Sequence, residues 1–233
     1  MIALSNGVES LTTAKKNIFI VDDHPVVREG LGAFIDKRET LSLCGTAENI
    51  QQALEGIAAT NPDLVLVDVS LDGESGLELI RNLKALKFKG RILVSSMHDE
   101  ALYAPRALEQ GAHGYVMKGV DCNSILDAME RVLEGHIVLS EAMQGRLLDH
   151  KPGQKKSEDP VKLSCLSNRE LQIFEMIGKG MSSRKIASVL RLSPKTVDRH
   201  RENIKTKLHL RNSIDLIQQA TMWLLEQPNG HGH

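Results

Sequence analysis

The sequence lacks the features that would assign it to a membrane, to a secreted disulfide scaffold or to a zinc-binding domain. Its longest apolar runs are far shorter than the roughly 20 residues that cross a bilayer. Residues 1–16 lack the continuous apolar core of a secretory signal, and we interpret them as an N-terminal extension. The three cysteines, Cys44, Cys122 and Cys165, are too far apart to indicate a disulfide framework or a zinc site. We expect a cytoplasmic protein with inert thiols and no membrane partner.

A large net charge is also missing from the chain as a whole, but not from its parts. The formal net charge of the 233 residues is −1. The segment from Asp159 to Gln227 holds 12 Lys and Arg against 7 Asp and Glu, whereas the rest holds 17 against 23. The C-terminal part is therefore basic and the rest acidic, which predicts a polyanionic partner for the C-terminal part alone.

Short apolar runs alternate with helical periodicity through residues 17–135, five times each. The five runs are NIFIV, LSLCGTA, LVLV, RILVSS and GYVM. Because these runs are nearly continuous rather than alternating, we expect strands that are buried on both faces. The pattern predicts an α/β fold, a doubly wound five-stranded parallel sheet with helices on both faces.

The remainder of the chain is predicted to be a linker followed by a small all-α domain. The stretch HKPGQKKSEDP combines proline, glycine and charge without periodicity, so we place a linker at residues 136–160. Residues 161–227 have helical periodicity, and Ser167 with Glu170 three positions later is a capping box. Residues 228–233 form a C-terminal tail.

Polar side chains follow the predicted strands at the points where the strands end. Asp22 and Asp23 follow the first strand and Asp68 the third, Ser95 and Ser96 end the fourth, and Lys118 follows the fifth. Ligands bind at the carboxyl edge of such sheets. Neighbouring carboxylates repel, so a hard cation is their natural counter-charge, and Mg²⁺ prefers oxygen ligands. Asp68 is our candidate nucleophile, because a carboxylate can attack a phosphoryl group in line and form an acyl phosphate.

The acids together with LVLVDVSLDGESG, VSSM and GYVMK resemble the receiver domain of two-component response regulators, over about residues 17–134. The resemblance implies a flavodoxin-like fold with strand order 2-1-3-4-5. It implies that Asp68 is the phosphoacceptor, Ser96 the switch hydroxyl, Tyr115 the rotating aromatic side chain and Lys118 the phosphate partner. The implied Mg²⁺ (or Mn²⁺) site comprises Asp22, Asp23, Asp68 and the Ser70 backbone carbonyl.

This chain departs from the receiver pattern at two positions. Asp72 stands where the family usually has proline, which removes a rigid turn and adds negative charge near the pocket. Pro105 falls inside the expected fourth helix, where an interior proline costs about 3 kcal/mol. We expect that helix either to start late or to be kinked.

The basic segment SSRKIASVLRLSPKTVDRHRENIKTKL has the spacing of a helix-turn-helix, with Ser193 as N-cap and Pro194 at the first position of its second helix. The N-terminal part of a recognition helix enters the major groove, where Arg199 can read guanine and Glu202 can accept from cytosine. Asn203 is a flanking candidate. The expected phosphate contacts are Arg184, Lys185, Lys195, Thr196 and Lys205.

The same segment, extended back to LSNRELQIFEMIGKGM, resembles the LuxR-type DNA-binding domain that closes response regulators of the NarL/FixJ subfamily. The resemblance implies that His200 is a partly buried framework residue and that the last helix, about residues 212–223, serves dimerisation. Where the family commonly has lysine this chain has Asp198, which we expect to orient Arg199 or Arg201 instead of contacting DNA.

The sequence therefore predicts a DNA-binding transcriptional response regulator that catalyses only its own phosphorylation and dephosphorylation. Its expected partners are a sensor histidine kinase, promoter DNA, a second copy of the chain and RNA polymerase. An Asp-nucleophile phosphatase resembling the haloacid dehalogenase group is the enzyme alternative, but it requires a second Asp where this chain has Ser70. An atypical receiver that works without phosphorylation is a third hypothesis, disfavoured by the complete set of acids, hydroxyl and lysine.

Overall fold

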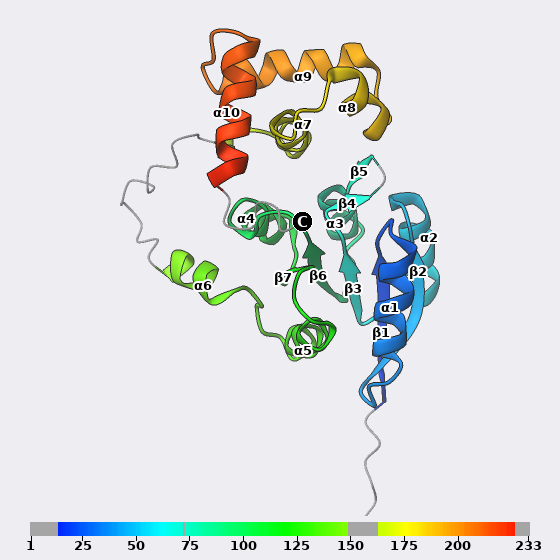
Figure 1. Ribbon diagram of the computed structural model, residues 1–233. Helices are drawn as coiled ribbons and strands as arrows, with labels where there is room; N and C mark the ends of the chain where they lie inside the picture. The colour runs from blue at the N-terminus through cyan, green and yellow to red at the C-terminus, as the bar shows by residue number, and fades with distance from the viewer. Residues whose placement is uncertain (1–13, 72, 149–162, 227–233) are drawn as a thin grey trace, which may run out of the picture.

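The computed structural model describes residues 14–71, 73–148 and 163–226, and its centre is a five-stranded parallel sheet (Figure 1). The sheet order is β2-β1-β3-β6-β7, and every neighbouring pair is parallel. The strands are β1 (Lys16–Val21), β2 (Leu41–Ala47), β3 (Leu64–Val67), β6 (Arg91–Ser96) and β7 (Gly114–Met117). Counting these main strands alone, the order is the predicted 2-1-3-4-5, so the α/β prediction is confirmed.

Helices cover both faces of the sheet because successive strand residues point to opposite sides. Ile18 and Ile20 of β1 lie in one apolar cluster with the first and fifth helices, and Phe19 and Val21 lie in the other with the second, third and fourth. These helices are α1 (Pro25–Ile35), α2 (Ile50–Thr60), α3 (Gly76–Ala85), α4 (Glu100–Gln110) and α5 (Cys122–Leu133). The sheet is thus buried on both faces, as the continuous apolar runs predicted.

A short hairpin that the sequence pattern did not predict follows β3. Its strands are β4 (Ser70–Leu71) and β5 (Glu74–Ser75). Gly76 begins α3 directly beneath the end of β3, and a Cβ there would lie 1.8 Å from the Asp68 carbonyl oxygen. Only glycine permits this close approach. Asp72 lies outside the described residues, so the consequence of its departure from the family pattern stays a prediction.

Helix α4 contains Pro105 in its interior. Asp99 caps the helix, its side chain accepting from the Leu102 N–H at 3.2 Å, and the helix begins at Glu100. The expectation of a late start is therefore wrong: the Asp99 cap sets the start well before the proline. Ala104 and Ala107, on either side of Pro105, are fully buried against the sheet, and this packing offsets the missing N–H donor.

Part of the segment predicted as a linker packs on the receiver. Val138 forms an isolated parallel bridge with Gly114 of β7, and Val138, Leu139 and Met143 are buried. A short helix, α6 (Glu141–Leu148), follows. Residues 149–160 of the predicted linker lie outside the described residues, and so do most of the N-terminal extension and the C-terminal tail. The domain boundaries at 135, 160 and 227 stay predictions.

The C-terminal domain is helical throughout its described part. It comprises η1 (Leu163–Cys165), α7 (Asn168–Gly178), α8 (Ser183–Val189), α9 (Pro194–Lys207) and α10 (Ser213–Glu226). Ser167 and Glu170 form the predicted capping box, and Ser193 caps α9 with Pro194 at its first position. No helix in the described ranges combines the length and apolar character needed to cross a bilayer.

Helix α7 lies between the receiver and α9 (Figure 1). It is buried almost all round, including the polar residues Gln172 and Glu175. Arg169 of α7 donates to the Gly73 carbonyl of the β4–β5 hairpin at 2.8 Å. Arg106 of α4 donates to the carbonyls of Leu163 and Leu166, both at 2.8 Å. The two domains therefore contact each other through α7, α4 and the hairpin that follows Asp68.

Candidate functional sites

The carboxyl edge of the sheet brings the predicted acids together. Val21 of β1 pairs with Val67 of β3, so Asp22 and Asp68 leave adjacent strands at the same level. Both are buried, with 3% and 5% of their surface exposed. Ligand atoms of Asp22, Asp23, His24 and Asp68 all lie within 4.8 Å of one another. This clustering is the arrangement that the sequence predicted for these acids.

Lys118 is the cation of this pocket. Its backbone N–H donates to the Ser96 carbonyl, and its Nζ lies 2.6 Å from Asp22 Oδ2 and 2.6 Å from Asp68 Oδ2. Burial raises the pKa of Asp68, although Lys118 opposes that rise. Burial alone would lower the pKa of Lys118, but the carboxylates of Asp68 and Asp22 outweigh it and raise the pKa. Lys118 therefore stays protonated and compensates two buried carboxylates.

His24 is a member of the cluster that sequence reasoning missed. It occupies the N-cap position of α1, yet its side chain makes no capping hydrogen bond. Instead its Nδ1 lies 2.7 Å from Asp23 Oδ1 and 3.3 Å from Asp22 Oδ1, and its backbone N–H donates to Asp22. The signal for it was its position directly after the acid pair.

Ser96 and Tyr115 are both buried beside the acidic pocket. Ser96 is fully buried, and its Oγ accepts a hydrogen bond from the His98 N–H at 3.2 Å. The Tyr115 hydroxyl donates to the His98 carbonyl at 2.7 Å, so its ring points inward. Burial raises the pKa of Tyr115 well above its ordinary value. Ser70 begins β4, and its side chain forms a hydrogen bond with the His98 ring. Sequence reasoning also missed His98.

The second set of predicted site residues lies on α8 and α9. Val197 and Ile204 of α9 are fully buried against the domain core. The opposite side of the helix carries the predicted base-reading residues, which are exposed: Arg199, Glu202 and Asn203. The predicted phosphate contacts Arg184, Lys185 and Lys195 are exposed, while Thr196 and Lys205 are partly buried. The helix thus has one apolar and one charged face, as its spacing predicted.

Two predicted DNA contacts are engaged with each other. Glu202 and Lys205 form an ion pair at 3.0 Å between Oε1 and Nζ, one turn apart. Asp198 is exposed, and its orienting role stays a prediction. His200 is partly buried, and burial lowers its pKa. The framework position implied for His200 agrees with this partial burial.

Two family models match the chain in the places where these two sites lie. Residues 18–130 match the response regulator receiver domain, and residues 164–220 match the bacterial regulatory proteins of the luxR family. The Fimbriae Z protein of Salmonella typhimurium is 33% identical over 205 residues, which cover 88% of this chain and 95% of that protein. This chain belongs to the response regulators of the NarL/FixJ subfamily.

Two further comparisons agree with this assignment. The nitrate/nitrite response regulator NarL of Escherichia coli (strain K12) is 29% identical over 210 residues, covering 90% of this chain and 95% of that protein. A crystal structure of a LuxR-family two-component response regulator from Aurantimonas sp. SI85-9A1 is 32% identical, with a TM-score of 0.55. The match covers 58% of this chain and 97% of the chain in that crystal structure. This response regulator therefore has a LuxR-type DNA-binding domain and belongs to a family of transcription regulators, not to an enzyme family.

Family membership makes the acidic cluster of this response regulator interpretable. The carboxylates of Asp22, Asp23 and Asp68 are typical of the Mg²⁺ site of receivers. Response regulators pair with histidine kinases.

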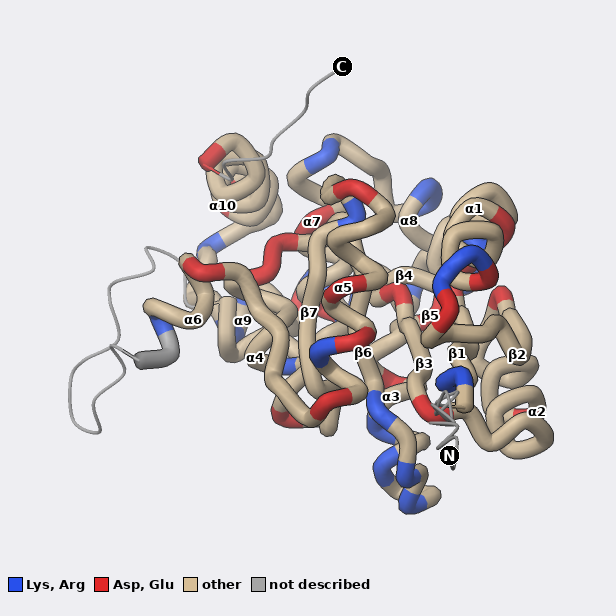
Figure 2. Tube along the Cα trace, turned by 90° about the horizontal axis from the view of Figure 1, so that it is seen from below, with Lys and Arg blue, Asp and Glu red and all other residues tan. Residues whose placement is uncertain are grey.

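Basic side chains do not mark a single surface of this regulator. Figure 2 shows Lys and Arg on both domains, with a group on the segment that follows α3. That segment contains the exposed residues Lys87 and Lys89, just before β6, and Lys84 in the last turn of α3 is also exposed. The charged face of α9 differs in belonging to a helix-turn-helix, and its contact with DNA stays a prediction.

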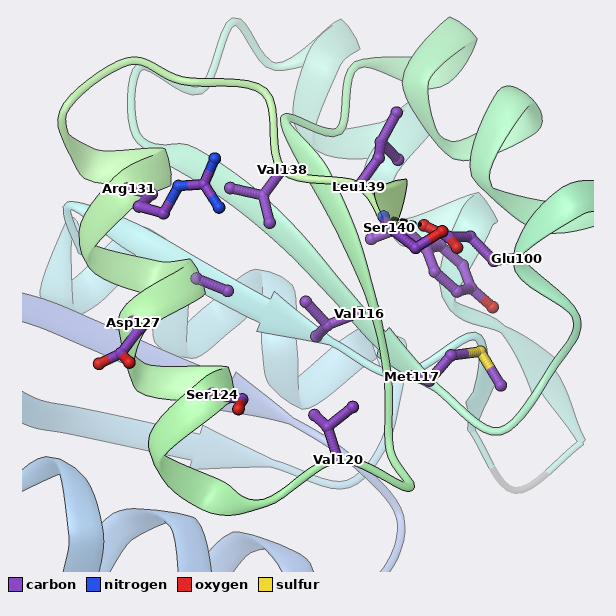
Figure 3. A pocket seen from close by; sticks show the side chains of 12 residues that line it. Glu100, Val116, Met117, Val120, Ser124, Asp127, Arg131, Val138, Leu139 and Ser140 are labelled. Carbon is purple, nitrogen blue, oxygen red and sulfur yellow. Dashed lines mark hydrogen bonds between the residues drawn. The ribbon is translucent and has the colours of Figure 1, made fainter. Parts of the chain in front are cut away.

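A hollow of about 340 Å³ lies on the outer side of the regulator's sheet, beside β7 (Figure 3). Its lining comes from β7, α5 and the segment that follows α5, and includes Val116, Val120 and Val138. The Ser140 N–H donates to Glu100 of α4 across its upper edge, at 2.8 Å. Tyr115 also lines the hollow.

Proposed function

We propose that a sensor histidine kinase transfers a phosphoryl group to Asp68, and that the phosphorylated regulator binds promoter DNA as a homodimer. The observation that carries this proposal is the pocket itself. A buried carboxylate lies 2.6 Å from a lysine ammonium at the carboxyl edge of a parallel sheet, in a cluster of acids. This arrangement supports nucleophilic attack on a phosphoryl group rather than a structural ion pair alone.

The phosphoryl transfer is an in-line displacement. A carboxylate oxygen of Asp68 forms the new bond to phosphorus, and the bond between phosphorus and the imidazole nitrogen of the kinase breaks, its electron pair returning to the imidazole. Lys118 neutralises charge on the phosphoryl oxygens and holds them in place. Ser96 donates its hydroxyl to a phosphoryl oxygen. Water later hydrolyses the acyl phosphate, which regenerates Asp68.

A divalent cation fits this pocket. Asp22, Asp23 and Asp68 supply the carboxylate oxygens that Mg²⁺ or Mn²⁺ prefers, and the Ser70 carbonyl is the fourth proposed ligand. The cation supplies charge neutralisation for the phosphoryl oxygens. Asp22 and Asp68 now share Lys118 as their counter-charge, so part of the acid cluster's repulsion is already compensated by the protein.

For the C-terminal domain, we propose that α9 enters the major groove. Arg199, Glu202 and Asn203 read bases there, because they occupy the exposed face of the helix. Arg184, Lys185, Lys195, Thr196 and Lys205 contact the phosphates. Helix α10 presents exposed Ile214, Ile217 and Leu225, which support its proposed role in dimerisation. We propose that the protein is cytoplasmic, binds promoter DNA and there has RNA polymerase as a partner.

The first experiment incubates the protein with acetyl phosphate and Mg²⁺ and measures the intact mass. We expect one added phosphoryl group on the wild type and none on Asp68→Asn. The matched control is Asp63→Asn, at the opposite end of β3, which pairs with Lys16 at the surface and should accept phosphoryl normally. A phosphorylated Asp68→Asn protein would refute the acceptor assignment.

The second experiment tests the link to DNA. Phosphorylated and unphosphorylated protein are titrated against promoter fragments, and their masses are measured in solution. We expect phosphorylation to favour the dimer and to tighten promoter binding about 5- to 150-fold, the range of ordinary allosteric coupling. Phosphorylation of Asp68 with no change in either quantity would contradict the regulatory half of the proposal.

A further inference from the structure

His98 joins the phosphoacceptor pocket to the DNA-binding domain through its two ring nitrogens. Nε2 lies 2.7 Å from the Oγ of Ser70, two residues after Asp68. Nδ1 lies 2.8 Å from Oε2 of Glu175, on α7 of the other domain. The ring also packs on Tyr103, with 4.6 Å between ring centroids. A single side chain therefore contacts the loop after the acceptor and the buried helix of the DNA-binding domain.

The backbone of His98 is held by the two switch residues. Its N–H donates to Ser96 Oγ at 3.2 Å, and its carbonyl accepts from the Tyr115 hydroxyl at 2.7 Å. A displacement of either side chain must therefore change the position of His98. Hydrogen bonds weaken steeply with distance and misalignment, so a small shift of the ring is enough to weaken its contact with Glu175.

Glu175 depends on the receiver for its partner. It is only 5% exposed, and a buried carboxylate is costly unless it is paired. It forms an ion pair with His98, across the domain boundary. Arg106 provides a contrast, because it also bridges the domains but donates to carbonyls of η1 and the start of α7, with no contact to the pocket. Of these two interdomain contacts, the one made by His98 is connected to the acceptor site and the one made by Arg106 is not; Arg169 adds a third, to the Gly73 carbonyl of the hairpin.

We infer that His98 is the coupling residue that makes docking of the DNA-binding domain depend on the state of Asp68. This inference rests on the proposed function, since it requires a phosphoryl group at Asp68. On Asp68 the phosphoryl group carries a charge of about −1.5 to −2 in place of the carboxylate's −1, so the pocket gains about −0.5 to −1 of charge and new acceptor oxygens. Ser96 then bonds the phosphoryl oxygens, Ser96 and Tyr115 change position, and the His98 ring moves away from Glu175. Docking through α7 weakens, while the contact made by Arg106 is unaffected.

The exposed face of α9 shows what this coupling controls. Arg199 and Asn203 are exposed while the domains are docked, and α9 lies on the side of α7 away from the receiver (Figure 1). Undocking therefore uncovers no base-reading residue. It frees the two DNA-binding domains of a dimer to take the spacing that two half-sites require.

The test measures docking directly in the full-length protein. Spin labels are placed at the exposed positions Glu55 of α2 and Gln218 of α10 (Glu55→Cys and Gln218→Cys), with the native cysteines replaced by serine. Double electron–electron resonance then gives the ratio of docked to undocked molecules, with and without beryllofluoride and Mg²⁺. We expect this ratio to fall about 10-fold in the wild type, within the usual range of allosteric coupling.

Two kinds of variant separate coupling from simple adhesion. Arg106→Ala should lower the docked ratio in both states by the same factor and keep the roughly 10-fold response. His98→Ala should remove the response, leaving the ratio within about 2-fold. Glu175→Ala removes the same contact by changing the residue on α7, and it should also remove the response. This second variant keeps the test valid if His98→Ala does not fold. A roughly 10-fold response in both His98→Ala and Glu175→Ala would overturn the inference.

The outcomes also separate this inference from the proposed function. Intact mass after acetyl phosphate treatment is measured on each sample. If the wild type accepts no phosphoryl group at Asp68, the proposed function fails and the coupling fails with it. If Asp68 is phosphorylated but the docked ratio of the wild type does not change, only the coupling is overturned.

Discussion

The proposed acceptor pocket and the proposed DNA-reading face use the same kinds of charged side chain in opposite surroundings. In the pocket, Asp68 is 5% exposed and Lys118 holds its carboxylate at 2.6 Å. On α9, Arg199 and Lys195 are exposed. Buried charges interact strongly but must be compensated. Exposed charges carry little desolvation cost, are screened by salt and are available to a partner.

The difference assigns a separate task to each region. A low-dielectric pocket holds reacting groups in place, and the charge of an added phosphoryl group interacts strongly with the charges already there. A solvated basic face attracts any polyanion and gains selectivity only through the few side chains that reach base edges. Changes to buried charge should therefore alter stability and chemistry, and changes to exposed charge should alter DNA binding alone.

The largest effect is expected from removing the buried cation. Lys118→Met leaves Asp22 and Asp68 without their counter-charge and should lower the free energy of unfolding by about 2–3 kcal/mol. Urea unfolding followed by circular dichroism, in EDTA, measures it. The matched control Lys16→Met breaks an exposed pair with Asp63 and should cost less than about 1 kcal/mol. Equal costs for the two variants would remove the distinction between buried and exposed charge.

Next in size is the loss of base readout. Arg199→Ala should cost about 1–3 kcal/mol on the cognate operator and much less on unrelated DNA, because a bidentate contact to guanine is lost. Stability should not change, since the side chain is exposed. Competition binding with cognate and scrambled duplexes tests this. Equal weakening on both duplexes would show that Arg199 contacts only phosphates.

A third prediction concerns pH. The buried Glu170 carboxylate pairs with Lys207 at 2.5 Å and with its Ser167 cap, and these contacts outweigh burial and lower its pKa. The folded pKa lies below the ordinary value of about 4.3, so this stabilisation is complete above that pH and is lost as pH falls through the folded pKa. Glu170→Gln retains a capping-box side chain but not the charge.

We expect Glu170→Gln to cost about 1 kcal/mol at pH 7 and progressively less as the pH falls through the folded pKa of Glu170. Trp223, the only tryptophan in the sequence, packs on Phe174 of α7 and reports the unfolding of this domain by fluorescence. A cost that did not shrink on acidification would mean that the loss comes from packing and not from the ion pair.

The smallest effect is expected at a single phosphate contact. Lys195→Ala should weaken binding to all DNA sequences alike and reduce the slope of log K against log salt by about 0.9. Lys205→Ala should change the slope less, because Lys205 is already paired with Glu202. Titrations at several salt concentrations decide between them. A larger slope change for Lys205 would mean that the ion pair opens on DNA.

Local patterns predicted most of the elements. The capping box at Ser167 and the cap at Ser193 were readable because each depends on residues three positions apart. The acids were predicted to meet because parallel strands end at one edge. The β4–β5 hairpin was missed, since its strands are two residues each and carry no periodicity. His98 was missed because its partners Ser70 and Glu175 are 28 and 77 positions away.

The sequence by itself determined the sheet, the acids at its edge and the amphipathic α9, since each follows from short-range spacing and from the rule that a buried face must be apolar. Only the tertiary structure decided that α7 is buried between the two domains and that His98 links Ser70 to Glu175. It also decided that α9 stays exposed while the domains are docked. Such contacts depend on which surfaces of two separately folded units complement each other, and no periodicity within either unit encodes that choice.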